Sequence, residues 1–175
     1  MGPGSDNSEG KFVALVNENR FKILKVCRVY AWNREDHEDL YQEILFQIWR
    51  SLPKLRDVAH TNTWLYRIAL NTAISFARKH RSRREKTINC HPGQLEELLE
   101  AKGASEPESN PELTALYQAI SQLDSMEKAV VTLFLEDFTY EQIAEVRGIT
   151  ANHVGVTLHR AKQKLSALME EVRHE

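Results

Sequence analysis

The sequence has no long hydrophobic run and is poor in cysteine, glycine and proline. Its 175 residues include two Cys, seven Gly and five Pro. No apolar stretch approaches the roughly 20 residues that a membrane-spanning helix needs, and the glycine-rich start lacks the apolar centre of a signal peptide. We therefore expect a protein that does not insert into a membrane and that stays inside the cell.

The two cysteines exclude a disulfide-stapled fold, because they are too few and too far apart in sequence. Cys27 lies in an apolar series, where a small buried residue is expected. Cys90 is followed by His91, but no CxxC or HxxxC spacing accompanies the pair. We treat both cysteines as structural and expect no metal and no cofactor.

The charges are unevenly distributed, although the formal net charge is only −2. The segment from Arg67 to Lys86 carries seven Lys and Arg against one acid. The segment from His91 to Leu113 carries six Glu against one Lys. A basic segment followed by an acidic one favours a polyanion-binding surface next to a tether.

Helical spacing of apolar residues recurs along the chain, whereas strand-like alternation does not persist. We therefore expect an all-α fold with two small helical domains, residues 11–90 and 113–175. Residues 1–10 are expected to be a disordered tail or a cloning remnant, and 91–112, rich in Pro and Glu, a flexible acidic linker. The expected helices cover 11–30, 34–52, a long segment capped among Thr61, Asn62 and Thr63, 113–123, 126–135, and two more after Thr139 and Thr150.

The third expected helix carries a polar stripe on the face away from its apolar stripe. Arg67, Asn71, Ser75 and Arg78 follow one another at spacings of four, four and three. This stripe leads into the basic run that follows. A positive groove with hydrogen-bonding groups is what single-stranded nucleic acid requires, so the stripe predicts such a surface.

The C-terminal stretch "TYEQIAEVRGITANHVGVTLHRAKQKL", residues 139–165, has the pattern of a helix-turn-helix. Thr139 and Gln142 form a capping-box spacing, Gly148 permits a tight turn, and Thr150 can cap the second helix. The apolar seam of that helix leaves the residues that would face the major groove of DNA pointing outward. An ordinary helical hairpin with a glycine turn fits the same pattern.

The whole chain resembles a bacterial alternative sigma factor of the extracytoplasmic-function (ECF) group. "EDLYQEILFQIWRSL" (38–52) and "TWLYRIALNTAI" (63–74) are similar to region 2 of that family, and "VTLFLEDFTYEQIAEVRGI" (131–149) with "LHRAKQKL" (158–165) to region 4. The resemblance implies a non-enzymatic protein of the bacterial cytoplasm. Its implied partners are core RNA polymerase, promoter DNA as duplex and melted single strand, and an anti-sigma factor.

The resemblance also implies three sets of binding residues. The set implied for core polymerase is Asp39, Gln42, Glu43, Gln47, Trp49 and Arg50. The set implied for the minus-10 promoter element is Lys54, Arg56, Asp57, His60, Asn62, Arg67, Asn71, Ser75, Arg78, Lys79 and Arg81. The set implied for the minus-35 element is Tyr140, Thr150, Asn152, His153, Val156, His159 and Arg160.

This sequence departs from the family pattern in both regions. The loop before the third helix has Asp57 and Thr61 where the family usually has a glycine and an aromatic residue. Region 4 has Gly155 and Thr157 at positions that are usually basic, and Asp137 in place of a glycine. Our hypothesis is that the second helix of region 4 steers recognition, while polymerase tethering and the basic segment 67–86 supply most of the affinity.

Parts of the sequence also fit two other functional classes, an enzyme and a one-component regulator. An enzyme could use Asp36, Asp39 and Glu43 on one helix face with His37 beside them, but no second acidic helix supplies matching ligands. A one-component helix-turn-helix regulator, acting without polymerase, would use the N-terminal half for dimerisation or ligand binding. That interpretation does not explain why the chain has a basic run followed by an acidic linker.

Overall fold

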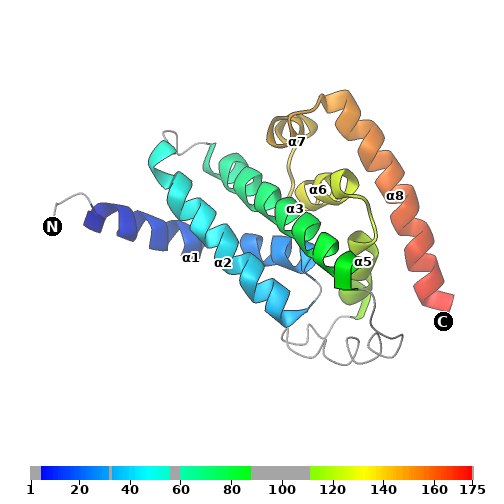
Figure 1. The fold of residues 1–175 in the computed structure, drawn as a ribbon. Coiled ribbons are helices and arrows are strands. Elements are labelled where there is room, and N and C mark those ends of the chain that lie inside the picture. The colour runs from blue at the N-terminus through cyan, green and yellow to red at the C-terminus, as the bar shows by residue number, and fades with distance from the viewer. Residues whose placement is uncertain (1–4, 32, 56–59, 88–110, 175) are drawn as a thin grey trace.

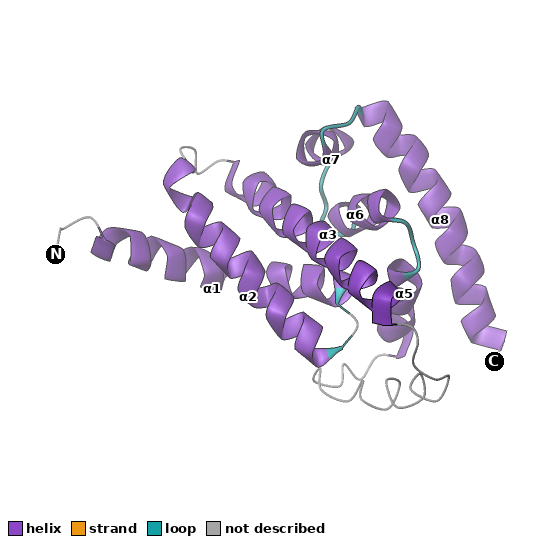
Figure 2. Cartoon of the chain, in the orientation of Figure 1, coloured by secondary structure: helices purple, strands orange, loops and turns teal. Residues whose placement is uncertain are grey.

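The computed structural model describes residues 5–31, 33–55, 60–87 and 111–174, and within these ranges the chain is helical and contains no strand (Figures 1 and 2). The all-α prediction is confirmed. The elements, in chain order, are α1 (Ser5–Tyr30), α2 (Arg34–Ser51), the short 3-10 helix η1 (Leu52–Lys54), α3 (Thr61–Thr87), α5 (Pro111–Ser121), α6 (Ser125–Phe134), α7 (Tyr140–Arg147) and α8 (Ala151–His174).

Helices α1, α3 and α5 begin earlier than the sequence predicts. α1 starts at Ser5 instead of Lys11, because only Gly10 interrupts the helix-compatible residues before it and a single glycine costs about 1 kcal/mol. α3 already includes Thr61, so the expected cap among residues 61–63 is wrong. The predicted linker, with its possible short helix at 94–101, lies outside the described residues except for Pro111 and Glu112, which begin α5.

The other helix ends follow the predicted local signals. Asn33 caps α2 by accepting a hydrogen bond from the backbone N–H of Asp36 at 2.7 Å. The capping box of Thr139 and Gln142 is complete at the start of α7. Gly148 ends α7 in the left-handed region, with φ of 68°, where glycine has no steric penalty. Asp137 adopts φ of 60° in the preceding turn, as its tolerance of that region allows.

The first half of the fold is a three-helix unit in which α2 and α3 each pack on α1 and on one another. α2 turns Leu40, Ile44 and Ile48 inward at helical spacing. α3 turns Leu65 and Ala69 inward, and all five side chains are fully buried. The apolar stripes that predicted these helices therefore form the core.

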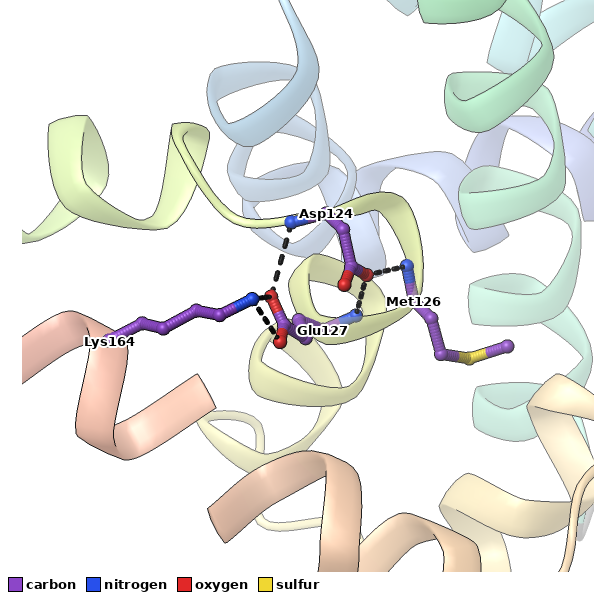
Figure 3. Close-up of polar contacts among 4 residues, drawn as sticks. All are labelled: Asp124, Met126, Glu127 and Lys164. Carbon is purple, nitrogen blue, oxygen red and sulfur yellow. Dashed lines mark hydrogen bonds and ion pairs between the residues drawn. The ribbon is translucent and has the colours of Figure 1, made fainter. Parts of the chain in front are cut away.

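The second half places α8 along the outside, packed on α5, α6 and α7 (Figure 1). α6 is enclosed on most sides, and its Glu127 is buried as well. Glu127 completes a capping box with Asp124, and its carboxylate accepts two hydrogen bonds from Lys164 of α8 at 2.6 and 2.8 Å (Figure 3). This contact ties α6 to α8 and neutralises a buried carboxylate that would otherwise be costly.

The two halves pack against each other. α1 contacts α5 and α6, and α3 contacts α6 and α7. Buried residues of both halves belong to one continuous hydrophobic cluster. Tyr66 of α3 and Phe138 before α7 meet edge to face at 5.1 Å within it. The free chain thus folds as a closed arrangement in which the helix-turn-helix lies on α3.

Candidate nucleic-acid and polymerase interfaces

The outer face of α8 carries the residues expected to read duplex DNA. Gly148 sets the turn between α7 and α8, and the Thr150 hydroxyl accepts a hydrogen bond from the backbone N–H of His153 at 3.2 Å. The remaining predicted minus-35 residues of α8 are all exposed: Asn152, His153, Val156, His159 and Arg160. The local signals in the sequence therefore produce a free face at the N-terminal turns of α8, where helix-turn-helix proteins contact bases.

The two uncharged positions that set this helix apart have different surroundings. Thr157 is only 7% exposed and faces the core, so a longer basic side chain there would not reach DNA by extending outward. Gly155 is on the outer face beside Tyr140 of α7. A Cβ at position 155 would lie 3.4 Å from Cε2 of that ring. Of the two positions, therefore, only 155 lies where a basic side chain would add positive charge to the DNA-facing surface.

The polar stripe of α3 is partly covered by α7. The Arg67 guanidinium donates a hydrogen bond to the Glu145 backbone carbonyl at 2.9 Å, and its distance to the Glu145 carboxylate is 3.5 Å. Arg147 donates a hydrogen bond to the Asn71 side-chain oxygen at 3.2 Å. Two residues predicted to bind the minus-10 element are therefore engaged by the helix-turn-helix of the same chain.

Glu136, in the turn before α7, anchors this contact. Its carboxylate accepts hydrogen bonds from the Tyr66 hydroxyl at 2.8 Å and from the Lys25 ammonium at 2.5 Å. The Glu136 side chain is 13% exposed and its bond with Tyr66 is partly buried, whereas the Lys25 side chain is 49% exposed, so that its ion pair with Glu136 is open to water. Burial, with the adjacent carboxylate, raises the pKa of Tyr66, and the hydrogen bond to Glu136 raises the pKa of Lys25. Sequence patterns gave no signal for this contact, since its members are far apart in the chain.

Other contacts between the two halves include cation–ring pairs and leave some buried polar groups without a hydrogen bond. The Arg28 guanidinium lies 4.3 Å from the centre of the Tyr117 ring, and the Lys128 ammonium 5.4 Å from that of Tyr30. Yet the Tyr30 hydroxyl and Nε of Arg147 are buried without a hydrogen-bond partner. Each such group costs on the order of 1–3 kcal/mol, which lowers the stability of the contact between the two halves.

A groove between α2 and α3 brings together residues from two predicted sets. Its α2 wall holds Asp39, Gln42, Glu43 and Gln47 of the polymerase set, and its α3 wall holds Asn71, Ser75 and Lys79 of the minus-10 set. Phe46 lies among the α2 residues and is 55% exposed. Sequence reasoning missed Phe46, although its spacing of three and four from Glu43 and Gln42 places it on the same helix face.

The rest of the polymerase set faces a second groove, formed by α1, the end of α2 and the start of α3. Trp49 and Arg50 line it, together with Asn62. Trp49 also packs edge to face on Phe12 at 5.2 Å, and Asn62 accepts a hydrogen bond from Lys22 at 2.6 Å. The predicted polymerase residues therefore line two grooves, and α2 contributes to both.

The remaining residues of the minus-10 set are distributed over several places in the chain. Arg56 and Asp57 lie outside the described residues. Four others are exposed on η1, just before α3, or along α3: Lys54, His60, Arg78 and Arg81.

Asp36, one of the three carboxylates that an enzyme could use, makes contacts that join two helices. Asp36 accepts a hydrogen bond from Asn33 and pairs with Nδ1 of His80 at 3.1 Å, which links the start of α2 to α3. Across the described ranges, no three His, Cys, Asp or Glu side chains are grouped so that they could hold a metal ion. Nor does any helix there have the length and apolarity needed to cross a membrane.

Both halves match known protein families. Residues 15–83 match the model of sigma-70 region 2, and residues 113–165 match the model of sigma-70 region 4. The two matches cover most of the three-helix unit and most of the helices that carry the helix-turn-helix.

Curated relatives and solved structures agree with these matches. RNA polymerase sigma factor SigV of Bacillus subtilis is 29% identical over 85% of each chain, and the ECF sigma-E factor of Escherichia coli is 27% identical over 88% of this chain and 84% of its own. The fold is similar to that of RpoE from Bartonella quintana, solved with the anti-sigma factor NepR (TM-score 0.65, 19% identity, 93% and 96% of the two chains). It is also similar to CnrH, solved with the cytosolic domain of CnrY (TM-score 0.61, 20% identity, 93% and 90%). The chain belongs to the sigma-70 family, in its ECF group of RNA polymerase sigma factors.

Proposed function

We propose that this chain binds core RNA polymerase and directs it to a promoter that the two halves of the chain recognise together. Residues 11–90 contact polymerase and open the minus-10 element, residues 113–175 read the minus-35 element, and residues 91–112 link them. The chain performs no catalytic step of its own. It works in the bacterial cytoplasm, where the polymerase acts.

The observation that carries this proposal is the free face of α8 in a chain that also holds a basic α3. The N-terminal turns of α8 expose Asn152, His153 and Arg160 to solvent. Amide and guanidinium groups at such positions are suited to hydrogen-bond the edges of adenine and guanine. α3 adds exposed positive charge for the phosphates, which dominate the affinity for DNA.

Core polymerase is the partner that fits the exposed face of α2. Gln42 and Glu43 surround Phe46 there, so an aromatic side chain lies within a polar rim. An exposed aromatic residue among polar neighbours is a common anchor in protein interfaces. The relatives SigV and sigma-E are named as RNA polymerase sigma factors, which supports the same partner.

Promoter opening requires the closed arrangement to open. Arg67 and Asn71 contact α7 in the free chain, so melted DNA reaches them only after the helix-turn-helix moves away. Binding to polymerase, which separates the two promoter-reading halves, is the step that uncovers them. An anti-sigma factor that prefers the closed form would hold the chain inactive. Of the two proteins with similar folds, RpoE was solved with the anti-sigma factor NepR and CnrH with the cytosolic domain of CnrY.

The test is transcription with purified core polymerase, with and without the chain, on fragments of bacterial DNA whose transcript starts are mapped. We expect new starts at sites that share two sequence elements. If the chain neither binds core polymerase nor changes the starts, the proposal is wrong. Sequence-specific binding of duplex DNA by the chain alone would then favour a one-component regulator, for which the exposed α8 of the free chain is suited.

A further inference from the structure

The predicted minus-35 surface contains an apolar hollow. It is lined by Tyr140 from the first turn of α7 and, on α8, by Ala151, Gly155 and Val156, with Asn152, His159 and Arg160 at its rim. Tyr140 is 40% exposed and Val156 44% exposed, so both apolar side chains are open to solvent in the free chain. A helix that needed only phosphate contacts would gain nothing from such a hollow.

Gly155 is the reason for the hollow. Position 155 is one helical turn from Ala151 and from His159, so the three lie in a row along α8. The Tyr140 ring lies beside that row and leaves room for a Cβ in ordinary contact and no more. Because Gly155 has no side chain, the helix surface at this position is the floor of the hollow, between the Tyr140 ring and Val156. Glycine inside a helix is less favourable than alanine, so the opening has a cost in stability.

The groups that bases present in the major groove indicate which of them fits the hollow. In the major groove, adenine, guanine and cytosine present donors and acceptors, whereas thymine alone also presents a methyl group. A polar edge placed on an apolar floor would lose water without gaining a partner, which is unfavourable. The polar rim can meet neighbouring bases and phosphates. The hollow is therefore suited to one methyl group flanked by polar contacts.

We propose that the hollow formed by Tyr140, Gly155 and Val156 binds the 5-methyl group of one thymine in the upstream promoter element. This inference rests on the proposed function, since it assumes that α8 enters the major groove. It assigns a sequence preference to the position where the family usually has a basic residue. Recognition there uses methyl burial in place of charge.

The test replaces each thymine of the mapped upstream element, on either strand, with deoxyuridine, and measures promoter binding by the holoenzyme. Deoxyuridine lacks only the methyl group. Burying one methyl group contributes about 0.8 kcal/mol, which corresponds to about fourfold in affinity. We expect one position at which the replacement weakens binding by about fourfold, with the salt dependence unchanged because no charge is altered.

Two variants locate the effect. Gly155→Ala fills the hollow and Tyr140→Ala removes its wall, and each should reduce the thymine preference to nearly one. Gly155→Ala should also raise the melting temperature, since alanine favours the helix. Ser166→Ala, at an exposed position further along α8, is the matched control and should keep the fourfold preference.

The outcomes separate this inference from the proposed function. If the holoenzyme binds its promoter but no thymine is sensitive, or the element has no thymine, the inference is wrong and the proposed function stands. If Gly155→Ala keeps the preference, the hollow holds something other than the methyl group and the inference is again wrong. If the chain gives no promoter binding with core polymerase, both fail.

Discussion

The guanidinium of Arg67 on α3 donates a hydrogen bond to the backbone carbonyl of Glu145 on α7, at 2.9 Å. A side chain predicted to bind melted DNA is thus bound to the first helix of the helix-turn-helix. Both partners remain about half exposed, so their ion pair contributes little to stability. The closed arrangement must depend more on the partly buried hydrogen bond between Tyr66 and Glu136 and on apolar packing.

Two tyrosines at the contact between the halves should respond differently to the same substitution. Tyr66→Phe removes a hydroxyl that donates to Glu136, whereas Tyr30→Phe removes a buried hydroxyl that has no partner. The first should weaken the closed form by about 1–2 kcal/mol, and the second should leave it unchanged or stabilise it. Because the closed form competes with polymerase binding, only Tyr66→Phe should tighten the apparent affinity for core polymerase.

The measurement is a titration of labelled chain with core polymerase, together with thermal unfolding of each variant. Equal shifts in affinity for Tyr66→Phe and Tyr30→Phe would show that the hydrogen bond to Glu136 does not hold the two halves together.

Phe46 should be an anchor for core polymerase. Its ring is exposed on the α2 face, so Phe46→Ala removes few contacts inside the free chain. We expect a loss of roughly tenfold or more in polymerase affinity, as for a central aromatic residue of an interface, with little change in melting temperature. Phe21→Ala is the same truncation at an exposed site on α1, and this control should keep full affinity. An unchanged affinity for Phe46→Ala would exclude that face of α2.

The buried carboxylate of Glu127 should stabilise the second half of the fold. Glu127→Gln weakens both the capping box and the contact with Lys164, and we expect a loss of about 1–3 kcal/mol in the free energy of unfolding. Lys164→Met should also destabilise, because it leaves the carboxylate buried without its cation. The double variant should lose less than the sum of the two, as measured by denaturant unfolding. Strict additivity would mean that the two side chains act independently, and Gln163→Met serves as the exposed control.

Arg160 should contribute to reading the minus-35 element without contributing to polymerase binding. It is exposed near the N-terminal turns of α8 and makes up part of the rim of the hollow. Arg160→Ala should weaken recognition of that element by about 1–3 kcal/mol, in a manner that depends on the base pair it contacts. Arg20→Ala on α1 controls for loss of positive charge. A simultaneous loss of promoter recognition and polymerase binding would instead assign Arg160 a structural role.

The sequence predicts the helices and the exposed face of α8 because both depend on local patterns. Asn33, Thr139 and Gly148 act within a few residues of their own positions, and each does in the structure what its type favours. The predicted start of α3 is wrong, since the helix already includes Thr61. Asn62, predicted as a possible cap, lies inside the helix and accepts a hydrogen bond from the distant Lys22, a contact that sequence spacing does not reveal.

The surfaces were less predictable, since they depend on how the halves pack. Periodicity places Arg67 and Asn71 on one stripe but cannot indicate that α7 covers them. Nor does it distinguish Thr157, which faces the core, from Gly155, which faces outward beside Tyr140. The family pattern has a basic residue at both positions, so by comparison both lack a charge here. Only the packed structure shows that one position faces outward and the other faces the core.

If the closed chain opens on core polymerase, the distance between α1 and α8 must increase. Asn17→Cys on α1 and Ala167→Cys on α8 place fluorescent labels at exposed sites in a Cys90→Ser background, while Cys27 stays unlabelled because burial raises the pKa of its thiol to about 12. We predict efficient energy transfer in the free chain and a large fall when core polymerase is added. Bound chain with unchanged transfer would contradict the account.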